Sequence, residues 1–340
     1  MSGFLFLFIF SPTVILPFNV LHILTMISLF FLFTKYQKKV PHVLKSPVLL
    51  IFIALMFFIT IYAFILRPLS PDGLRASYNY AVTILELVPC TIFISLVLLE
   101  HKVDLNKFYD IILFTGMLQV ACVILTMILP DLREWIIASA YDKTLEDTYE
   151  KVSSFRMYGL ARGYTFSMPL FQGLCVIIAF VLGAYKSSKY YLLIPFFMVS
   201  IAVNARIAMI CLLIVPCVVF FFRFRKQPIK QTASILLVFA SLVIMVKFIQ
   251  YMAEGSSSYD TWFWLDQGLK ELTNLKEGEK TGNLAYLADT MWFMPKGIYE
   301  LTFGTGENVF GRVYMSSDIG YVINLYYGGI VFSSILYLSY

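Results

Sequence analysis

Apolar stretches of roughly 20 residues recur along the whole chain, and this feature limits its fold more than any other. A helix that crosses the hydrocarbon core of a bilayer, about 30 Å thick, needs roughly that length. The strands of a membrane barrel would alternate polar and apolar residues, whereas these stretches are apolar on every side. With 59% hydrophobic and 14% charged residues, the chain also lies far outside the range of soluble domains. We therefore predict an all-α, polytopic transmembrane helical bundle.

The number of predicted spans is about nine or ten. Leu5–Leu16 is one more candidate, which Pro12 and Pro17 make short or broken. Met1–Phe10 lacks a basic start and a cleavage site, so we interpret it as a retained membrane segment. The clearest spans are Phe18–Phe33, Pro47–Leu66, Tyr78–Leu99, Phe108–Leu129, Tyr164–Ala184, Tyr190–Val203, Ile207–Phe222, Ile229–Gln250 and Ile319–Leu338.

Short basic loops set the predicted orientation, because lysine and arginine gather on the cytoplasmic side of membrane proteins. These loops follow the first, third, fifth and seventh spans, so they share one side. Their basic residues are Lys35, Lys38, Lys39, Lys45, Lys102, Lys107, Lys186, Lys189, Arg223, Arg225, Lys226 and Lys230. We expect a multi-pass protein of the bacterial cytoplasmic (inner) membrane, folded as a single integral membrane domain over residues 1–340.

Two long segments then fall on the external, periplasmic face: residues 130–163 and residues 251–318. They hold most of the acidic residues of the chain. Binding and catalytic residues concentrate on loops that a rigid scaffold holds in place. We therefore expect the working surface on this face.

Several arginines stand at positions where a charge is costly or useful. Arg156 and Arg162 precede the fifth span, and Arg206 interrupts an apolar stretch. An arginine fork binds phosphate with two hydrogen bonds, so these residues fit a clamp for a lipid-linked diphosphate. The alternative for Arg156 and Arg162 is that they anchor a helix end at the interface. Glu86, inside the third span, suits a structural counter-ion of Arg206 or a polar cavity.

The second external loop adds further candidates. Phe303–Asn308 is a glycine-rich turn, although its external location argues against a nucleotide cradle. Asp318, which opens the last span, fits either a helix N-cap or a carboxylate that accepts a proton from a sugar hydroxyl. Aromatic residues of this loop suit either the interfacial belt or stacking on sugar rings. They are Tyr251, Tyr259, Trp262, Phe263, Trp264, Tyr286, Trp292 and Phe293.

Some function classes lack their motifs in this sequence. There is no Asp-x-Asp for a metal-bound sugar nucleotide and no Walker lysine motif for ATP. The histidines, His22, His42 and His101, all lie outside the two long loops. We expect no metal, no cofactor and no nucleic-acid partner.

Four local stretches, in this order, resemble the bacterial Wzy proteins, the O-antigen and capsule repeat-unit polymerases of the O-antigen ligase/polymerase superfamily. Together with the topology, the likeness covers about two-thirds of the chain. The stretches are Arg156–Leu160, Asn204–Arg206, Thr302–Gly306, and Ser317–Tyr321 with Leu325 and Gly328–Ile330. Family members usually continue with further spans where this chain stops at Tyr340, so we expect the sequence to be short at that end.

The resemblance implies a GT-C-like membrane fold and a metal-independent, inverting glycosyltransferase. Such an enzyme transfers a growing polysaccharide from one undecaprenyl diphosphate onto another lipid-linked repeat unit. Its partners would be an undecaprenyl-diphosphate-linked oligosaccharide, membrane lipid and, in some systems, a chain-length regulator. Arg156 and Arg206 would hold the leaving diphosphate, Asp318 is the candidate proton acceptor, and Arg162, Arg312 and Glu86 would contact substrate.

Two alternatives stay open. Ligases of the superfamily use a histidine in the large external loop, which this sequence lacks. A lipid-linked oligosaccharide flippase would suit Glu86 and Arg206, but transporters often show paired repeats and we find none.

Overall fold

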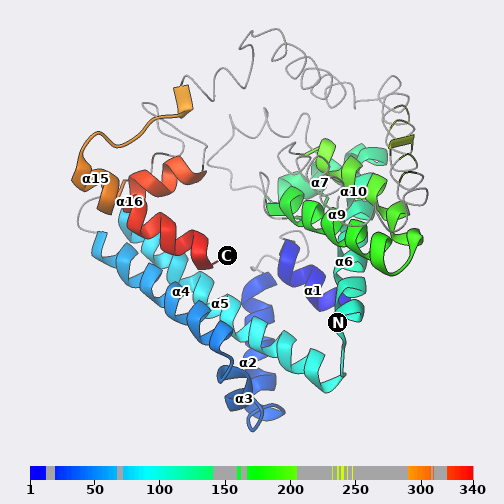
Figure 1. The fold of residues 1–340 in the computed structure, drawn as a ribbon, viewed down its shortest axis with the longest axis horizontal. Helices are drawn as coiled ribbons and strands as arrows, with labels where there is room; N and C mark the ends of the chain where they lie inside the picture. Colours follow the sequence, from blue (N-terminus) through cyan, green and yellow to red (C-terminus); the bar gives the residue numbers. More distant parts are fainter. Residues whose placement is uncertain are drawn as a thin grey trace. The chain divides into compact units, whose positions relative to one another are not determined.

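The computed structural model describes residues 1–12, 20–66, 72–140, 159–161, 167–204, 232, 236, 239, 240, 243, 247, 290–307, 309 and 320–339 (Figure 1). Every regular element in these segments is a helix. The chain divides into two compact units. The first comprises Met1–Leu24 and Val103–Gly268, and the second Thr25–Lys102 and Leu269–Tyr340.

In the second unit, α4 (Pro47–Leu66) packs along α5 (Asp72–Glu100) and against α16 (Gly320–Ser339) (Figure 1). Most of α2 (Val20–Thr34), the short α3 (Val40–Leu44) and α15 (Ile298–Phe303) belong to the same unit. Its core joins buried side chains of α4, such as Ile59 and Ala63, to Tyr327 and Phe332 of α16.

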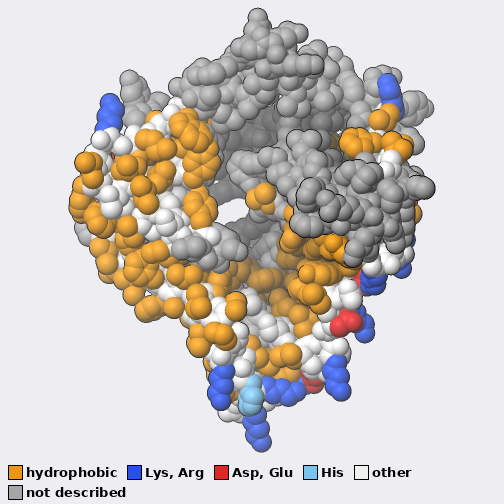
Figure 2. Space-filling view, in the orientation of Figure 1, with side chains coloured by type: hydrophobic (Ala, Val, Ile, Leu, Met, Phe, Trp, Pro, Cys, Tyr) orange, Lys and Arg blue, Asp and Glu red, His pale blue; other side chains and the backbone are white. Residues whose placement is uncertain are grey.

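The opposite surface of α4 is apolar as well. It carries the large apolar residues Phe57, Phe64 and Ile65, whose exposed fractions are 62%, 59% and 64%. A soluble helix would carry polar residues there, whereas a helix in lipid needs none. Orange side chains cover this part of the molecule in Figure 2.

In the first unit, α6 (Leu105–Ile128) packs against α1 (Ser2–Phe10), α9 (Ser167–Tyr185) and α10 (Ile194–Ala202). Asp104 caps α6, since its carboxylate accepts a hydrogen bond of 2.8 Å from the Lys107 amide. A 3-10 helix, η3 (Ser188–Leu193), leads into α10, and α7 (Pro130–Ala140) follows α6.

Three helices of the described residues are long and apolar enough to cross a membrane: Pro47–Leu66, Leu105–Ile128 and Met168–Tyr185. Shorter apolar helices cover Val20–Thr34, Ser188–Ala202 and Tyr321–Tyr337. The described residues are therefore helical, as predicted, with apolar helices at these predicted spans. The predicted spans Ile207–Phe222 and Ile229–Gln250 lie almost entirely outside the described residues, so the total of about nine or ten remains a prediction.

One predicted span and one predicted loop differ in detail from the observed helices. The segment Tyr190–Val203 forms η3 and the nine-residue α10, whose side chains from Phe197 to Ala202 are all buried. This apolar segment therefore lies in the core of its unit. The first predicted loop, residues 130–163, begins with the helix α7.

The ends of α2 and α5 are joined through Glu100. Lys35 Nζ donates a 2.9 Å hydrogen bond to its carboxylate, and the Tyr36 hydroxyl donates another. The Tyr36 bond first, and then the Lys35 bond, lower the pKa of Glu100 from 4.5 to about 2. In the folded chain this carboxylate therefore stays charged at pH values where it would ordinarily be protonated.

A carboxylate whose pKa is lower in the folded chain than in the unfolded chain stabilises the fold at pH values above its unfolded pKa. That contribution is lost as the pH falls through the pKa of the folded chain. We therefore expect Glu100→Gln to lower the thermal unfolding midpoint in detergent at neutral pH. The difference from the wild type should shrink between pH 4.5 and about 2. Glu134→Gln, at an exposed position of α7, is the matched control and should show no such trend. A difference that stays constant across this range would contradict the assignment.

Candidate functional site

Of the six charged residues that the sequence assigns to the site, Glu86 alone lies among the described residues. The others lie outside them: Arg156, Arg162, Arg206, Arg312 and Asp318. Parts of all four motifs are nevertheless described, and their contacts show which flanking segments meet in space.

Glu86 is buried in α5, 6% exposed. One turn further along, Cys90 Sγ lies 3.5 Å from Ser28 Oγ and 3.7 Å from Thr25 Oγ1 of α2. Cys90, Ser28 and Thr25 thus form polar contacts between α5 and α2, and Glu86 is buried one turn away in α5, where a carboxylate is costly. Its pairing with Arg206 remains a prediction.

The end of the first motif is anchored on α6. Gly159 has a φ of +57°, and a Cβ atom there would lie 2.8 Å from Gln119 Nε2 and 3.1 Å from the Val123 amide nitrogen. Only glycine allows both this backbone conformation and this close approach. The residue therefore fixes how the chain passes over α6 just before Ala161.

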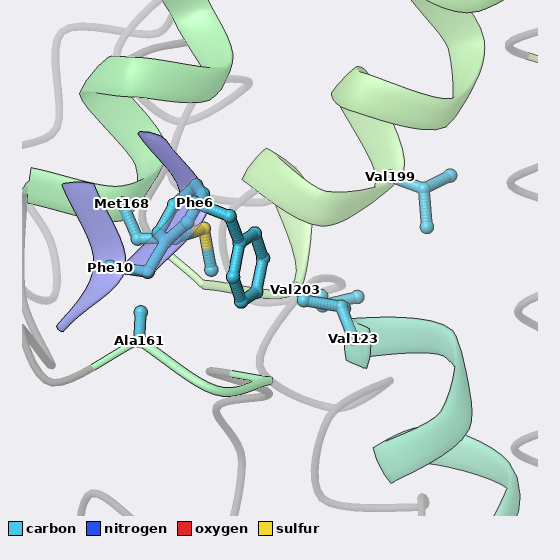
Figure 3. Packing of buried hydrophobic residues seen from close by; sticks show 7 residues of the cluster. All are labelled: Phe6, Phe10, Val123, Ala161, Met168, Val199 and Val203. Carbon is cyan, nitrogen blue, oxygen red and sulfur yellow. The ribbon is translucent and has the colours of Figure 1, made fainter. Parts of the chain in front are cut away.

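Ala161 and Val203 belong to one cluster of buried apolar side chains, although 42 positions separate them in the sequence (Figure 3). Phe6 and Phe10 of α1, Val123 of α6 and Met168 of α9 complete its centre together with Val199. Arg162 follows Ala161 directly in the sequence, and Asn204–Arg206 follows Val203. The first two motifs are thus joined through this cluster.

Buried amides lie close to the cluster. Asn204, 1% exposed, donates from Nδ2 to the Ser200 carbonyl at 2.8 Å. Gln172, fully buried, donates from Nε2 to the Gly116 carbonyl at 3.3 Å, which links α9 to α6. The Gln172 bond is interhelical, and bonds of this kind hold apolar helices together. We assign these amides to the scaffold.

The third and fourth motifs meet at a break in α16. Gly329 has a non-helical conformation (φ 68°, ψ −170°), so the preceding carbonyl groups lose their helical donors. The Thr305 amide donates to the Tyr326 carbonyl at 2.8 Å, and the Gly306 amide donates to the Tyr327 carbonyl at 2.9 Å. The Thr305 hydroxyl adds a 3.0 Å bond to the Tyr326 carbonyl.

We call this arrangement the Gly304–Gly329 clasp, because the two glycines meet so closely that a Cβ atom on Gly329 would lie 2.6 Å from the Gly304 amide nitrogen. The amides of Thr305 and Gly306 already donate to α16, so they are not available to cradle a phosphate. The turn instead fixes α15 against the broken helix. The Tyr62 hydroxyl of α4 also donates to the Phe303 carbonyl at 2.9 Å, which ties the clasp to a membrane-length helix.

The aromatic residues of the second loop divide into two kinds. Phe293 packs against Tyr326, with ring centroids 5.1 Å apart, in a small buried cluster. Trp292 meets Tyr321 edge to face at 4.9 Å, and both rings are more than 40% exposed (49% and 41%). Exposed aromatic faces of this kind suit either the membrane interface or a sugar ring. The remaining aromatic candidates of this loop lie outside the described residues.

No group of three or more His, Cys, Asp or Glu that could hold a metal ion occurs in the described part of the chain. No protein-family model, curated protein or solved structure matches the sequence.

The clasp generates a stability prediction. A Cβ atom on Gly329 would lie 2.3 Å from the Thr302 carbonyl oxygen, and its φ of +68° strains any other residue. We expect Gly329→Ala to lower the free energy of unfolding by about 1–3 kcal/mol from backbone strain alone, and by more from the collision. Thermal unfolding of the purified chain in detergent measures this.

Gly297→Ala in the same unit is the matched control. Gly297 has an ordinary φ of −88°, and its nearest neighbours are atoms of the flexible Glu300 side chain at 3.3 Å. This variant should unfold near the wild-type temperature. Equal midpoints for both variants would show that the clasp does not hold α15 on α16.

Proposed function

We propose that this chain is a Wzy-type repeat-unit polymerase, a multi-pass enzyme of the bacterial inner membrane that works at its periplasmic face. The observation that carries the proposal is the pairing of the motifs. The segments before Arg162 and Arg206 share one buried cluster, and the glycine-rich turn is bonded to the helix that follows Asp318. Within each of the two units, contacts between motifs so distant in sequence bring loop segments together, as a site built from loops requires.

In the proposed reaction, a hydroxyl oxygen of the acceptor sugar attacks the anomeric carbon of the donor sugar. The bond from that carbon to the phosphate oxygen breaks, and undecaprenyl diphosphate leaves with its electron pair. Asp318 accepts the proton of the hydroxyl. Arg156 and Arg206 bind the diphosphate as its charge develops, and Arg162 and Arg312 contribute to substrate binding.

The exposed pair Trp292 and Tyr321 suits the sugar part of such a substrate. Tyr321 lies in the first turn of α16, three residues after Asp318. An aromatic ring stacked on a sugar buries apolar C–H surface and leaves the hydroxyl groups free to react. This position favours a polymerase over a flippase, which has no reacting hydroxyl to orient.

The first test is the ladder of surface polysaccharide on a gel, from the native host with the gene deleted and then restored. We expect deletion to leave lipid A-core with a single repeat, or its capsular equivalent, because export and ligation continue without polymerisation. Restoration should return the ladder. Loss of even the single repeat would favour a ligase or a flippase, and an unchanged ladder would refute a role in this polysaccharide.

Arginine variants then test the site. We expect Arg156→Ala, Arg206→Ala and Arg312→Ala to lose chain extension, since removal of one donor to a developing oxyanion costs about 10²–10³ in rate. Arg225→Ala, on the predicted cytoplasmic side, is the matched control and should keep the ladder. The amount of each variant in the membrane fraction is measured in parallel. Normal ladders from the first three would contradict the assigned site.

A further inference from the structure

The described part of the second unit carries a concentrated positive charge at one end. The segments 31–46 and 97–102 contain Lys35, Lys38, Lys39, Lys45 and Lys102 against a single acidic residue, Glu100. With histidine neutral, these segments carry four excess positive charges. In Figure 2, blue side chains and a pale-blue one gather where Figure 1 draws α3.

Contacts with Tyr36 hold part of this charge in place. Tyr36 is buried, 2% exposed, and its ring has Lys35 Nζ at 5.0 Å and Lys39 Nζ at 5.8 Å from its centre. Lys35 and the Tyr36 hydroxyl both donate to Glu100, so the only carboxylate of these segments is already bound. Lys38, Lys39 and Lys45 are exposed around α3.

Exposed apolar residues adjoin the lysines on both sides in the chain. Phe30 and Phe33 precede them in α2 (63% and 73% exposed), and Val48 and Ile51 follow them in α4 (76% and 59% exposed). The short helix α3 between them packs its apolar side chains, Val40, Val43 and Leu44, against the same cluster as Tyr36. The lysines therefore stand where an exposed apolar surface ends, and basic residues placed in this way next to a membrane attract anionic headgroups.

We propose that this surface, which we call the Tyr36 basic patch, binds an anionic phospholipid such as phosphatidylglycerol in preference to a zwitterionic one. The lysines bind the negatively charged headgroup, and the exposed side chains of α2 and α4 contact its acyl chains. An acidic protein segment or a free phosphate would match the lysines but leave these apolar side chains uncovered. Only a lipid matches both parts of the surface.

A related arrangement in the first unit offers an internal comparison. There Lys186 Nζ and the Tyr190 hydroxyl donate to Asp110 at 3.0 and 2.7 Å, and Lys186 and Lys189 lie over the Tyr190 ring. The charge nearby is almost balanced, because Lys107, Lys186 and Lys189 face Asp104 and Asp110. The Asp110 site thus has a local geometry similar to that of the Tyr36 basic patch, but it lacks the large excess of positive charge.

Native mass spectrometry of the full-length chain in detergent measures the bound lipid directly. We expect the wild type to retain phosphatidylglycerol in preference to phosphatidylcholine. The triple variant Lys38→Gln, Lys39→Gln, Lys45→Gln should bind phosphatidylglycerol about tenfold more weakly or worse, since each basic residue near a headgroup adds to its attraction. Its affinity for phosphatidylcholine should not change.

The matched control removes three exposed lysines elsewhere: Lys107→Gln, Lys189→Gln, Lys296→Gln. It should keep phosphatidylglycerol within about twofold of the wild-type affinity, because the patch is intact. Inorganic phosphate at matched ionic strength should displace the lipid no better than chloride. An equal loss in both triple variants, equal binding of the two lipids by the wild type, or specific displacement by phosphate would each overturn the proposal. The proposal does not depend on the polymerase function, since the measurement involves no polysaccharide.

Discussion

In hydrocarbon, a backbone carbonyl that loses its helical donor costs several kcal/mol unless another donor replaces it. The break in α16 at Gly329 creates this problem, and the Gly304–Gly329 clasp solves it by supplying the Thr305 and Gly306 amides. The second unit depends on this exchange. It lets an apolar helix change direction, and it fixes α15, which stands just before the glycine-rich turn, at a defined position on that helix.

The sequence predicted the membrane helices well where local signals coincide with the apolar run. For α4 the predicted and observed bounds are both Pro47–Leu66, because proline favours the first turn and Arg67–Pro68 follows the end. By contrast, α5 begins at Asp72 and not at Tyr78, since a helix need not stop where its apolar residues do. The helix α7 was missed because it lies in a polar stretch without a membrane-length apolar run.

The sequence motifs of the candidate site could be recognised, but the contacts between them could not be predicted. The motifs containing Gly159 and Gly304 could be recognised, yet a positive φ cannot be read from the letter alone. Whether Ala161 would meet Val203 depends on how α1, α6 and α9 pack, and that is a property of contacts distant in sequence. The pair Gly328-Gly329 inside an apolar run was the one local sign of the break in α16.

The distribution of polar groups in the first unit explains why the proposed chemistry belongs to the arginines. Gln172 and Asn204 are buried, and each donates a hydrogen bond to a backbone carbonyl, which stabilises the helices. The described chain before Arg162 and Arg206, which ends at Ala161 and Asn204, is thus held by buried packing and hydrogen bonds. Electrostatic stabilisation of a leaving diphosphate requires donors whose positions are set before the reaction begins, since any reorganisation would add to the barrier. Under the proposed function, the buried amides act by holding the chain segments from which the arginines extend.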